Sequence, residues 1–136
     1  MAFYFDTSAL VKLVVPEAET EALRAWLATS PRTLVSCDLT RTELARAARR
    51  VAPSRSLRVR AVLEAISLTK VTTATFEVAG RLDPEGLLSL DAIHVAAALE
   101  LGDDLEGFVA YDRRLAEAAE ANGIAVSAPG QAPIAR

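Results

Sequence analysis

Short apolar segments alternate with helix-like segments along almost the whole chain. Five of the apolar segments are too short for ordinary helices and are rich in β-branched or aromatic residues, so we expect them to be strands. They are Ala2–Asp6, Thr33–Cys37, Leu68–Thr72, Phe108–Tyr111 and Ile124–Ser127. Continuous apolar runs of this kind are typical of parallel strands that are covered on both faces of a sheet.

The segments between these runs have the apolar spacing and the end signals of helices. Pro16 and Pro53 interrupt two of them, and Gly102 and Gly123 follow two others at positions typical of a helix end. We expect helices over Ser8–Val15, Glu17–Ser30, Leu39–Val51, Leu57–Ile66, Thr75–Arg81, Asp91–Leu101 and Asp112–Asn122. The alternation predicts an α/β fold, a three-layer α/β/α sandwich with a mostly parallel central sheet of about five strands.

Length and composition limit the class of protein. The chain has 136 residues, of which 51% are hydrophobic, which fits one domain over residues 1–128 and a loose tail over residues 129–136. No apolar run reaches the roughly 20 residues of a membrane span, and no basic leader precedes the first strand, so we expect a cytoplasmic protein. One cysteine and one histidine exclude a disulfide framework and a zinc site built from this chain alone.

Acidic residues follow several of the predicted strands. Asp6, Asp38 and Asp112 stand at strand ends, while Glu43 and Asp91 lie at the beginning of predicted helices. Ligands of open parallel sheets bind at the carboxyl ends of the strands, so these carboxylates are expected near one another. Clustered carboxylates repel each other unless they are protonated or bind cations, and hard oxygen ligands suit Mg²⁺ or Mn²⁺.

Each of these acids also has a structural interpretation. Aspartate is a favoured residue at a helix N-cap, so Asp6, Asp91 and Asp112 could each simply cap the helix that follows. Thr40 and Glu43 have the spacing of a capping box. For any one residue the structural role is at least as plausible, and the functional interpretation depends on the whole set.

A basic segment stands out from the rest of the chain. Residues 41–60 hold seven arginines and one acid, although the net charge of the chain is −3. Arg46 and Arg50 follow Glu43 by three and seven residues, so on a helix they share its side and could hold phosphates of a nucleic acid. The alternative for each arginine is a solvated helix face or a salt bridge to an acid of this chain.

Three linked motifs and a matching glutamate resemble the PIN-domain ribonucleases. The segment Asp6–Lys12 (DTSALVK) is similar to the opening motif of that family, and Glu43 matches its second acid. Residues 90–98 (LDAIHVAAA) and 108–115 (FVAYDRRL) resemble the segments of the third and fourth acids, in the usual order and spacing. The resemblance covers nearly the whole chain, and the length and single domain are similar to those of VapC-type toxins.

The resemblance implies a metal-dependent endoribonuclease that acts as the toxin of a toxin–antitoxin pair. The implied catalytic residues are Asp6, Glu43, Asp91 and Asp112, of which Asp6, Asp91 and Asp112 would bind Mg²⁺ or Mn²⁺. Ser8 would support the site by a hydrogen bond to a metal ligand or to bound water. The implied partners are an RNA substrate, a cognate VapB-type antitoxin and a second copy of the chain in a homodimer. The apolar segments Ser8–Val15 and Glu17–Ser30 are the expected docking groove and dimer surface.

Other notable residues are expected to be structural. His94 lies three residues after Asp91 on the same helix face, and we expect it to be a buried histidine packed beneath the site. Cys37 is expected in the core, with Trp26 and neighbouring leucines and valines in the core or an interface. Tyr111 stands where the family often has Thr or Ser before the fourth acid, so a hydroxyl is lost from the metal site or moved outward.

Two alternatives stay open at this point. A receiver or aspartyl phosphatase domain could use Asp6 as a nucleophile, but position 8 is serine rather than a second acid, and neither Lys12 nor Lys70 follows the fourth strand. A PIN-like scaffold could bind RNA or protein without cutting, although all four acids are present. Metal binding would distinguish this scaffold from an enzyme.

Overall fold

The computed structural model describes residues 1–132 and has a five-stranded, all-parallel sheet in the order β3-β2-β1-β4-β5. The strands are β1 (Ala2–Phe5), β2 (Thr33–Cys37), β3 (Ser67–Thr69), β4 (Leu105–Val109) and β5 (Val126–Ser127). This confirms the predicted α/β fold with a parallel sheet of about five strands.

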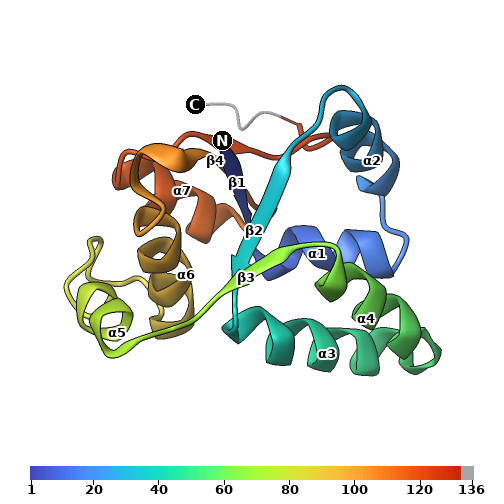
Figure 1. Ribbon diagram of the computed structural model, residues 1–136, viewed down its shortest axis with the longest axis horizontal. Coiled ribbons are helices and arrows are strands. Elements are labelled where there is room, and N and C mark those ends of the chain that lie inside the picture. The colour runs from blue at the N-terminus through green and yellow to red at the C-terminus, as the bar shows by residue number, and fades with distance from the viewer. Residues whose placement is uncertain (133–136) are drawn as a thin grey trace.

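Seven α-helices occur among the described residues, and they cover both faces of the sheet. They are α1 (Thr7–Val14), α2 (Thr20–Ala28), α3 (Leu39–Val51), α4 (Ser56–Glu64), α5 (Thr73–Ala79), α6 (Ser89–Leu99) and α7 (Arg113–Ala121). Figure 1 shows α1 to α4 on one side of the sheet and α5, α6 and α7 on the other. Within residues 1–132 no helix combines the length and the apolar character needed to cross a membrane.

Strand β1 lies at the centre of the sheet and carries a core on each face. Ala2 and Tyr4 belong to the cluster packed against α6 and α7, while Phe5 belongs to the cluster under α1, α3 and α4. Tyr4 and Phe5 are fully buried. The alternation of side chains along a strand explains why β1 is apolar at consecutive positions.

The strand order reverses at β1, and this reversal creates the place for a site. The chain adds β2 and β3 on one side of β1 and then β4 and β5 on the other. Asp6 follows β1, and its backbone N–H donates to the carbonyl of Val109 at the end of β4 (3.0 Å). The carboxyl ends of β1 and β4 therefore form the switch-point crevice in which ligands of open α/β sheets bind.

Several boundaries differ from those predicted. Helix α6 begins at Ser89, with Leu88 in extended backbone at its N-cap, so Asp91 lies inside the first turn. Helix α2 begins at Thr20 rather than at Glu17. Strand β3 ends at Thr69, and β4 begins at Leu105.

The beginning of the predicted tail is held against the domain. The hydroxyl of Tyr111 donates to the carbonyl of Pro129 (2.7 Å), and the Gln131 side chain donates to the carbonyl of Tyr111 (3.2 Å). Residues 129 and 131 are thus hydrogen-bonded to Tyr111, and the looseness of the tail over residues 129–136 stays a prediction. The last residues of the tail, 133–136, lie outside the described residues.

Candidate active site

Asp6 is a buried acid at the end of the central strand. Its Oδ2 accepts hydrogen bonds from the backbone N–H (3.2 Å) and the hydroxyl (2.6 Å) of Ser8, so it caps α1. Its Oδ1 lies 3.7 Å from Nε2 of His94. Burial raises the pKa of Asp6, while His94 and Ser8 oppose that rise without cancelling it. Asp6 therefore caps α1 with Oδ2 alone, and Oδ1 is available to bind a ligand.

Glu43 reaches the same place from α3. Its Oε1 accepts a hydrogen bond from the hydroxyl of Thr7 (2.8 Å) and lies 2.5 Å from Nε2 of His94. Burial acts to raise the pKa of Glu43, but the hydrogen bond and charge of His94 outweigh it, and the pKa is lowered. Glu43 is thus held as a carboxylate between α1 and α6.

The capping box predicted for Glu43 is wrong. Thr40 lies inside the first turn of α3, and its buried hydroxyl is 2.6 Å from the hydroxyl of Ser36 in β2. Asp38 occupies the N-cap position without a side-chain capping bond and pairs instead with Arg41. The position of Glu43 on the helix therefore has no capping function, and its contacts all belong to the crevice.

The buried side chain of His94 lies between Asp6 and Glu43, within 3.7 Å of the first and 2.5 Å of the second. Its side chain is 1% exposed, and its Nδ1 lies 2.7 Å from the hydroxyl of Tyr4. Burial disfavours the imidazolium, but hydrogen bonds to Cys37 and Glu43 and the negative charges of Asp6 and Glu43 raise the pKa of His94 to about 10. The predicted burial of His94 is confirmed. What the sequence reasoning missed is that this buried histidine bonds directly to Glu43.

Asp91 and Asp112 complete a group of four acids. Asp91 is half-buried in the first turn of α6 and has no capping bond, so the structure does not support the alternative role of a helix cap. Burial raises its pKa, and the charges of Asp112, Asp6 and Glu43 raise it further. Asp112 is exposed and caps α7, with Oδ1 accepting from the backbone N–H of Leu115 (3.2 Å). The negative charges of the other three acids therefore act on Asp91.

The donors of this site suit a hard divalent cation. Asp6 and Asp112 each use one carboxylate oxygen in a cap, and Asp91 uses none, so each has an oxygen to offer. Asp91 forms no ion pair within residues 1–132, and burial, followed by the negative charges of Asp112, Asp6 and Glu43, raises its pKa. In the part of the chain that the structure describes, no three such side chains are arranged closely around a single point. Oxygen donors without cysteine are typical of Mg²⁺ or Mn²⁺ sites.

Ser8 joins the two strands that frame the crevice. Its hydroxyl donates to Asp6 and accepts the backbone N–H of Tyr111 (2.9 Å), the residue before Asp112. The hydrogen bond to the carboxylate of Asp6 is the contact expected of Ser8. The phenol of Tyr111 turns away toward Pro129, so its hydroxyl has moved outward from the acids.

The basic residues of α3 form an exposed patch on the outer side of that helix. Arg46, Arg49 and Arg50 surround a hollow of about 410 Å³. All three side chains are exposed, and none forms an ion pair with another described residue. Since Glu43 begins the same face of α3, the patch extends from the acids along the helix.

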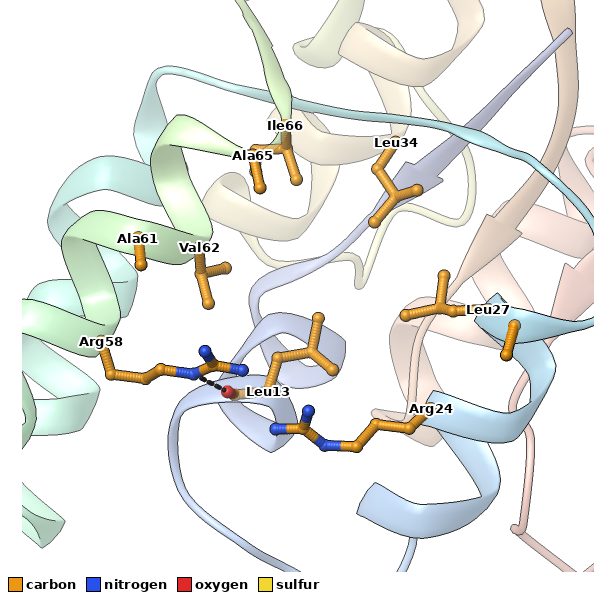
Figure 2. A pocket seen from close by; sticks show the side chains of 10 residues that line it. Leu13, Arg24, Leu27, Leu34, Arg58, Ala61, Val62, Ala65 and Ile66 are labelled. Carbon is orange, nitrogen blue, oxygen red and sulfur yellow. Dashed lines mark hydrogen bonds between the residues drawn. The ribbon is translucent and has the colours of Figure 1, made fainter.

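An apolar groove lies at the other end of α1. It has a volume of about 450 Å³, and its walls include Leu13 of α1, Leu27 of α2 and Val62 of α4. Figure 2 shows the side chains of Arg24 and Arg58 reaching from opposite walls toward Leu13. Arg58 Nε donates to the carbonyl of Leu13 (3.0 Å). The groove therefore has apolar walls and two positive charges, those of Arg24 and Arg58, at its opening.

Comparison with known families and solved structures agrees with this geometry. Residues 3–121 match the PIN domain family. A crystal structure of VapC20 from Mycobacterium tuberculosis, titled a sarcin-ricin loop cleaving toxin, has a similar fold with a TM-score of 0.73 at 18% sequence identity. The alignment covers 94% of this chain and 100% of that one.

Characterised sequences from Mycobacterium tuberculosis are similar over nearly their whole length. Ribonuclease VapC46 is 43% identical over 129 residues, covering 94% of this chain and 98% of the relative. Ribonuclease VapC35 is 44% identical over 133 residues, covering 95% and 98%. Ribonuclease VapC47 is 37% identical over 131 residues, covering 93% and 96%.

Proposed function

The chain belongs to the PIN domain family and to its VapC ribonucleases, and we propose that its four acids hydrolyse RNA with a bound Mg²⁺ or Mn²⁺. The protein is an endoribonuclease toxin of a toxin–antitoxin system, and the cytoplasm, where RNA is found, is its proposed place of action. Membership of this family sets aside the receiver and phosphatase alternatives. The observation that carries the metal proposal is the placement of the acids: Asp6 and Asp112 follow the adjacent strands β1 and β4, and His94 of α6 lies 2.5 Å from Glu43 and 3.7 Å from Asp6. The raised pKa of Asp91, caused by burial and by the charges of Asp112, Asp6 and Glu43, agrees with this placement.

Asp6, Asp91 and Asp112 are the proposed metal ligands. The chemistry that a divalent ion supplies there is activation of a water molecule and neutralisation of charge on the scissile phosphate. Ser8 and the backbone of Leu115 hold Asp6 and Asp112 in fixed orientations through the capping bonds. Glu43, kept ionised by His94 and Thr7, is available to accept a proton or to orient water.

The patch of Arg46 and Arg50 is the proposed path for the RNA backbone. Phosphates attract arginines without regard to sequence, and this attraction is strongest where acids of the protein do not neutralise the cations. Arg46 and Arg50 are exposed and lie on the face of α3 that begins at Glu43. RNA bound along α3 would therefore lead toward the acids.

Cleavage of RNA by the purified protein tests this function. We expect fragments in Mn²⁺ or Mg²⁺ that disappear in EDTA and with Asp91→Asn. Asp38→Asn is the control, because Asp38 is also an aspartate at the beginning of a helix but pairs with Arg41 on the surface. A protein that binds RNA equally with and without metal, and never cuts it, would be the non-nuclease scaffold instead.

The apolar groove of Figure 2 is the proposed docking site for a VapB-type antitoxin. Apolar walls suit one face of an amphipathic segment, and Arg24 and Arg58 suit acidic residues beside that face. This assignment refines the expected docking surface on α1 and α2, because α4 also contributes a wall. Arg24→Glu should weaken the binding of an antitoxin peptide. The second proposed partner is another copy of the chain in a homodimer, which the molecular mass in solution tests.

A further inference from the structure

A second hollow is lined by Asp91, one of the four acids. It has a volume of about 400 Å³ and is formed between α7 and the segment that leads into α6. Leu87, Leu88 and Ala121 provide apolar walls, and Asp91, Arg114 and Glu117 provide polar ones. We call it the α6–α7 hollow. Because Asp91 belongs both to this wall and to the proposed metal site, a ligand in the hollow is next to the reacting phosphate.

Hydrogen bonds fix the segment that forms one wall of the α6–α7 hollow. The side chain of Asn122 at the end of α7 donates to the carbonyl of Asp83 (2.9 Å), and the backbone N–H of Leu87 donates to the carbonyl of Pro84 (3.0 Å). The first bond connects the segment before α6 to the end of α7, and the second lies within that segment. Leu88 nevertheless remains 60% exposed, which leaves apolar surface available to a ligand. A hollow with apolar walls and a few polar groups is typical of a small-ligand site.

The polar groups of the hollow are free to contact a ligand. Arg114 and Glu117 are exposed and lie one turn apart on α7. Neither takes part in an ion pair with any residue between 1 and 132. Arg114 lies two residues after Asp112 and supplies a positive charge that suits the phosphates of the proposed RNA substrate. Glu117 supplies a carboxylate with two hydrogen-bond acceptor oxygens. This carboxylate repels the phosphates of RNA, so it favours RNA binding only where a base donates N–H groups to it.

This inference rests on the proposed function, because the ligand is part of the RNA substrate. We propose that the α6–α7 hollow binds an unstacked guanine base beside the scissile phosphate, and that Glu117 determines this preference. The apolar walls contact the face of the base, and the carboxylate accepts the N1–H and the 2-amino group. Proteins read single-stranded RNA in this way, through unstacked bases whose Watson–Crick edges are free.

The choice of guanine follows from the acceptor. The Watson–Crick edge of guanine has two adjacent N–H donors, which match the two oxygens of a carboxylate. Adenine and cytosine each present a single amino group beside a ring acceptor. Uracil places its one N–H between two carbonyl oxygens, which a carboxylate repels. The expected order of affinity is therefore guanine first and uracil last.

Four labelled heptanucleotides test the proposal, each with six uridines and either G, A, C or U at the centre. Binding is measured by fluorescence anisotropy in Ca²⁺, and cleavage is measured separately in Mn²⁺. We expect the guanine heptamer to bind about tenfold more tightly than the all-uridine one. Glu117→Gln should reduce this ratio to about threefold or less. Glu106→Gln is the matched control, because Glu106 is exposed in β4, before the apolar residues that end at the site.

The outcomes separate this proposal from the function on which it rests. Equal binding of all four heptamers, or a guanine preference unchanged by Glu117→Gln, overturns the base-binding proposal. Failure of the unaltered protein to cut any heptamer or total RNA in Mn²⁺ counts against the nuclease, whatever the binding ratios are. A guanine preference that disappears equally in Glu106→Gln and Glu117→Gln would also contradict a specific role for Glu117.

Discussion

Nε2 of His94, buried in α6, lies 2.5 Å from Oε1 of Glu43 in α3. The two residues are 51 positions apart and join the helices on opposite faces of the sheet, beneath its carboxyl edge. This pair keeps Glu43 ionised and places a positive charge under Asp6. The site with four acids thus contains one buried cation, the imidazolium of His94. The pKa of this imidazolium can be measured.

We expect His94 to stay protonated through neutral pH. Its folded pKa is raised to about 10, so the stabilisation from protonation is fully present below its ordinary value of 6.5 and is lost as the pH rises toward 10. The chain has one histidine, so the Cε1–H signal in NMR is unambiguous. That signal should not change between about pH 6 and pH 8. Glu43→Gln should lower the midpoint, and an unaltered midpoint would contradict a direct role of this pair.

Asp91→Asn should stabilise the metal-free protein while abolishing cleavage. Burial and three neighbouring acids raise the pKa of Asp91, so its ionised form is unfavourable in the fold at neutral pH. Asparagine has nearly the same shape without the charge. Because Asp91 is half-exposed, the gain is at most about 1 kcal/mol, or roughly 3–5 °C in the melting temperature. Thermal unfolding in EDTA measures it, and a melting temperature that falls would show that the repulsion is unimportant.

Much of the fold could be predicted because its signals are local. The strands are short apolar runs and the helices have end signals, so the alternation alone indicated a parallel sheet with helices on both faces. Boundaries were less predictable where a polar residue seemed to be a cap. Asp91 was expected to open its helix, but Leu88 takes the N-cap position in extended backbone, and α6 gains two residues before the acid.

The candidate site was predictable only in part, because its members come from distant segments. Asp6 and Asp112 follow strands, and parallel strands bring their ends to one edge of the sheet, whereas Glu43 and Asp91 lie near the beginnings of α3 and α6. The contact between His94 and Glu43 has no local signal, since helix spacing relates His94 only to Asp91. The spacing of Thr40 and Glu43 even suggested a capping box, which is wrong because Thr40 bonds to Ser36 within the core.

Ser8→Ala should destabilise the fold and reduce activity together. It removes the hydroxyl that donates to Asp6 and leaves the backbone N–H of Tyr111 without its acceptor. Loss of such part-buried bonds costs about 1–3 kcal/mol. Urea unfolding measures the cost, and Ser54→Ala, in the exposed 3-10 helix Pro53–Arg55, provides a control. A change below about 0.5 kcal/mol would mean that Ser8 does not hold the two strand ends together.

The two arginine surfaces should have separable partners. Arg46 and Arg50 lie on α3 beside the acids, whereas Arg24 lies at the mouth of the apolar groove on α2. Changing Arg46 and Arg50 together to Gln should weaken RNA binding. It should also reduce the slope of log K against log salt concentration by about 0.7 for each phosphate that the protein no longer neutralises. Arg24→Gln should leave that slope unchanged and weaken the binding of an antitoxin peptide. Anisotropy titrations of one RNA and one peptide, each over a range of salt concentrations, measure both effects. If Arg24→Gln lowers the RNA slope as much as the double change does, RNA binding extends over the groove, and the groove is then not reserved for a protein partner.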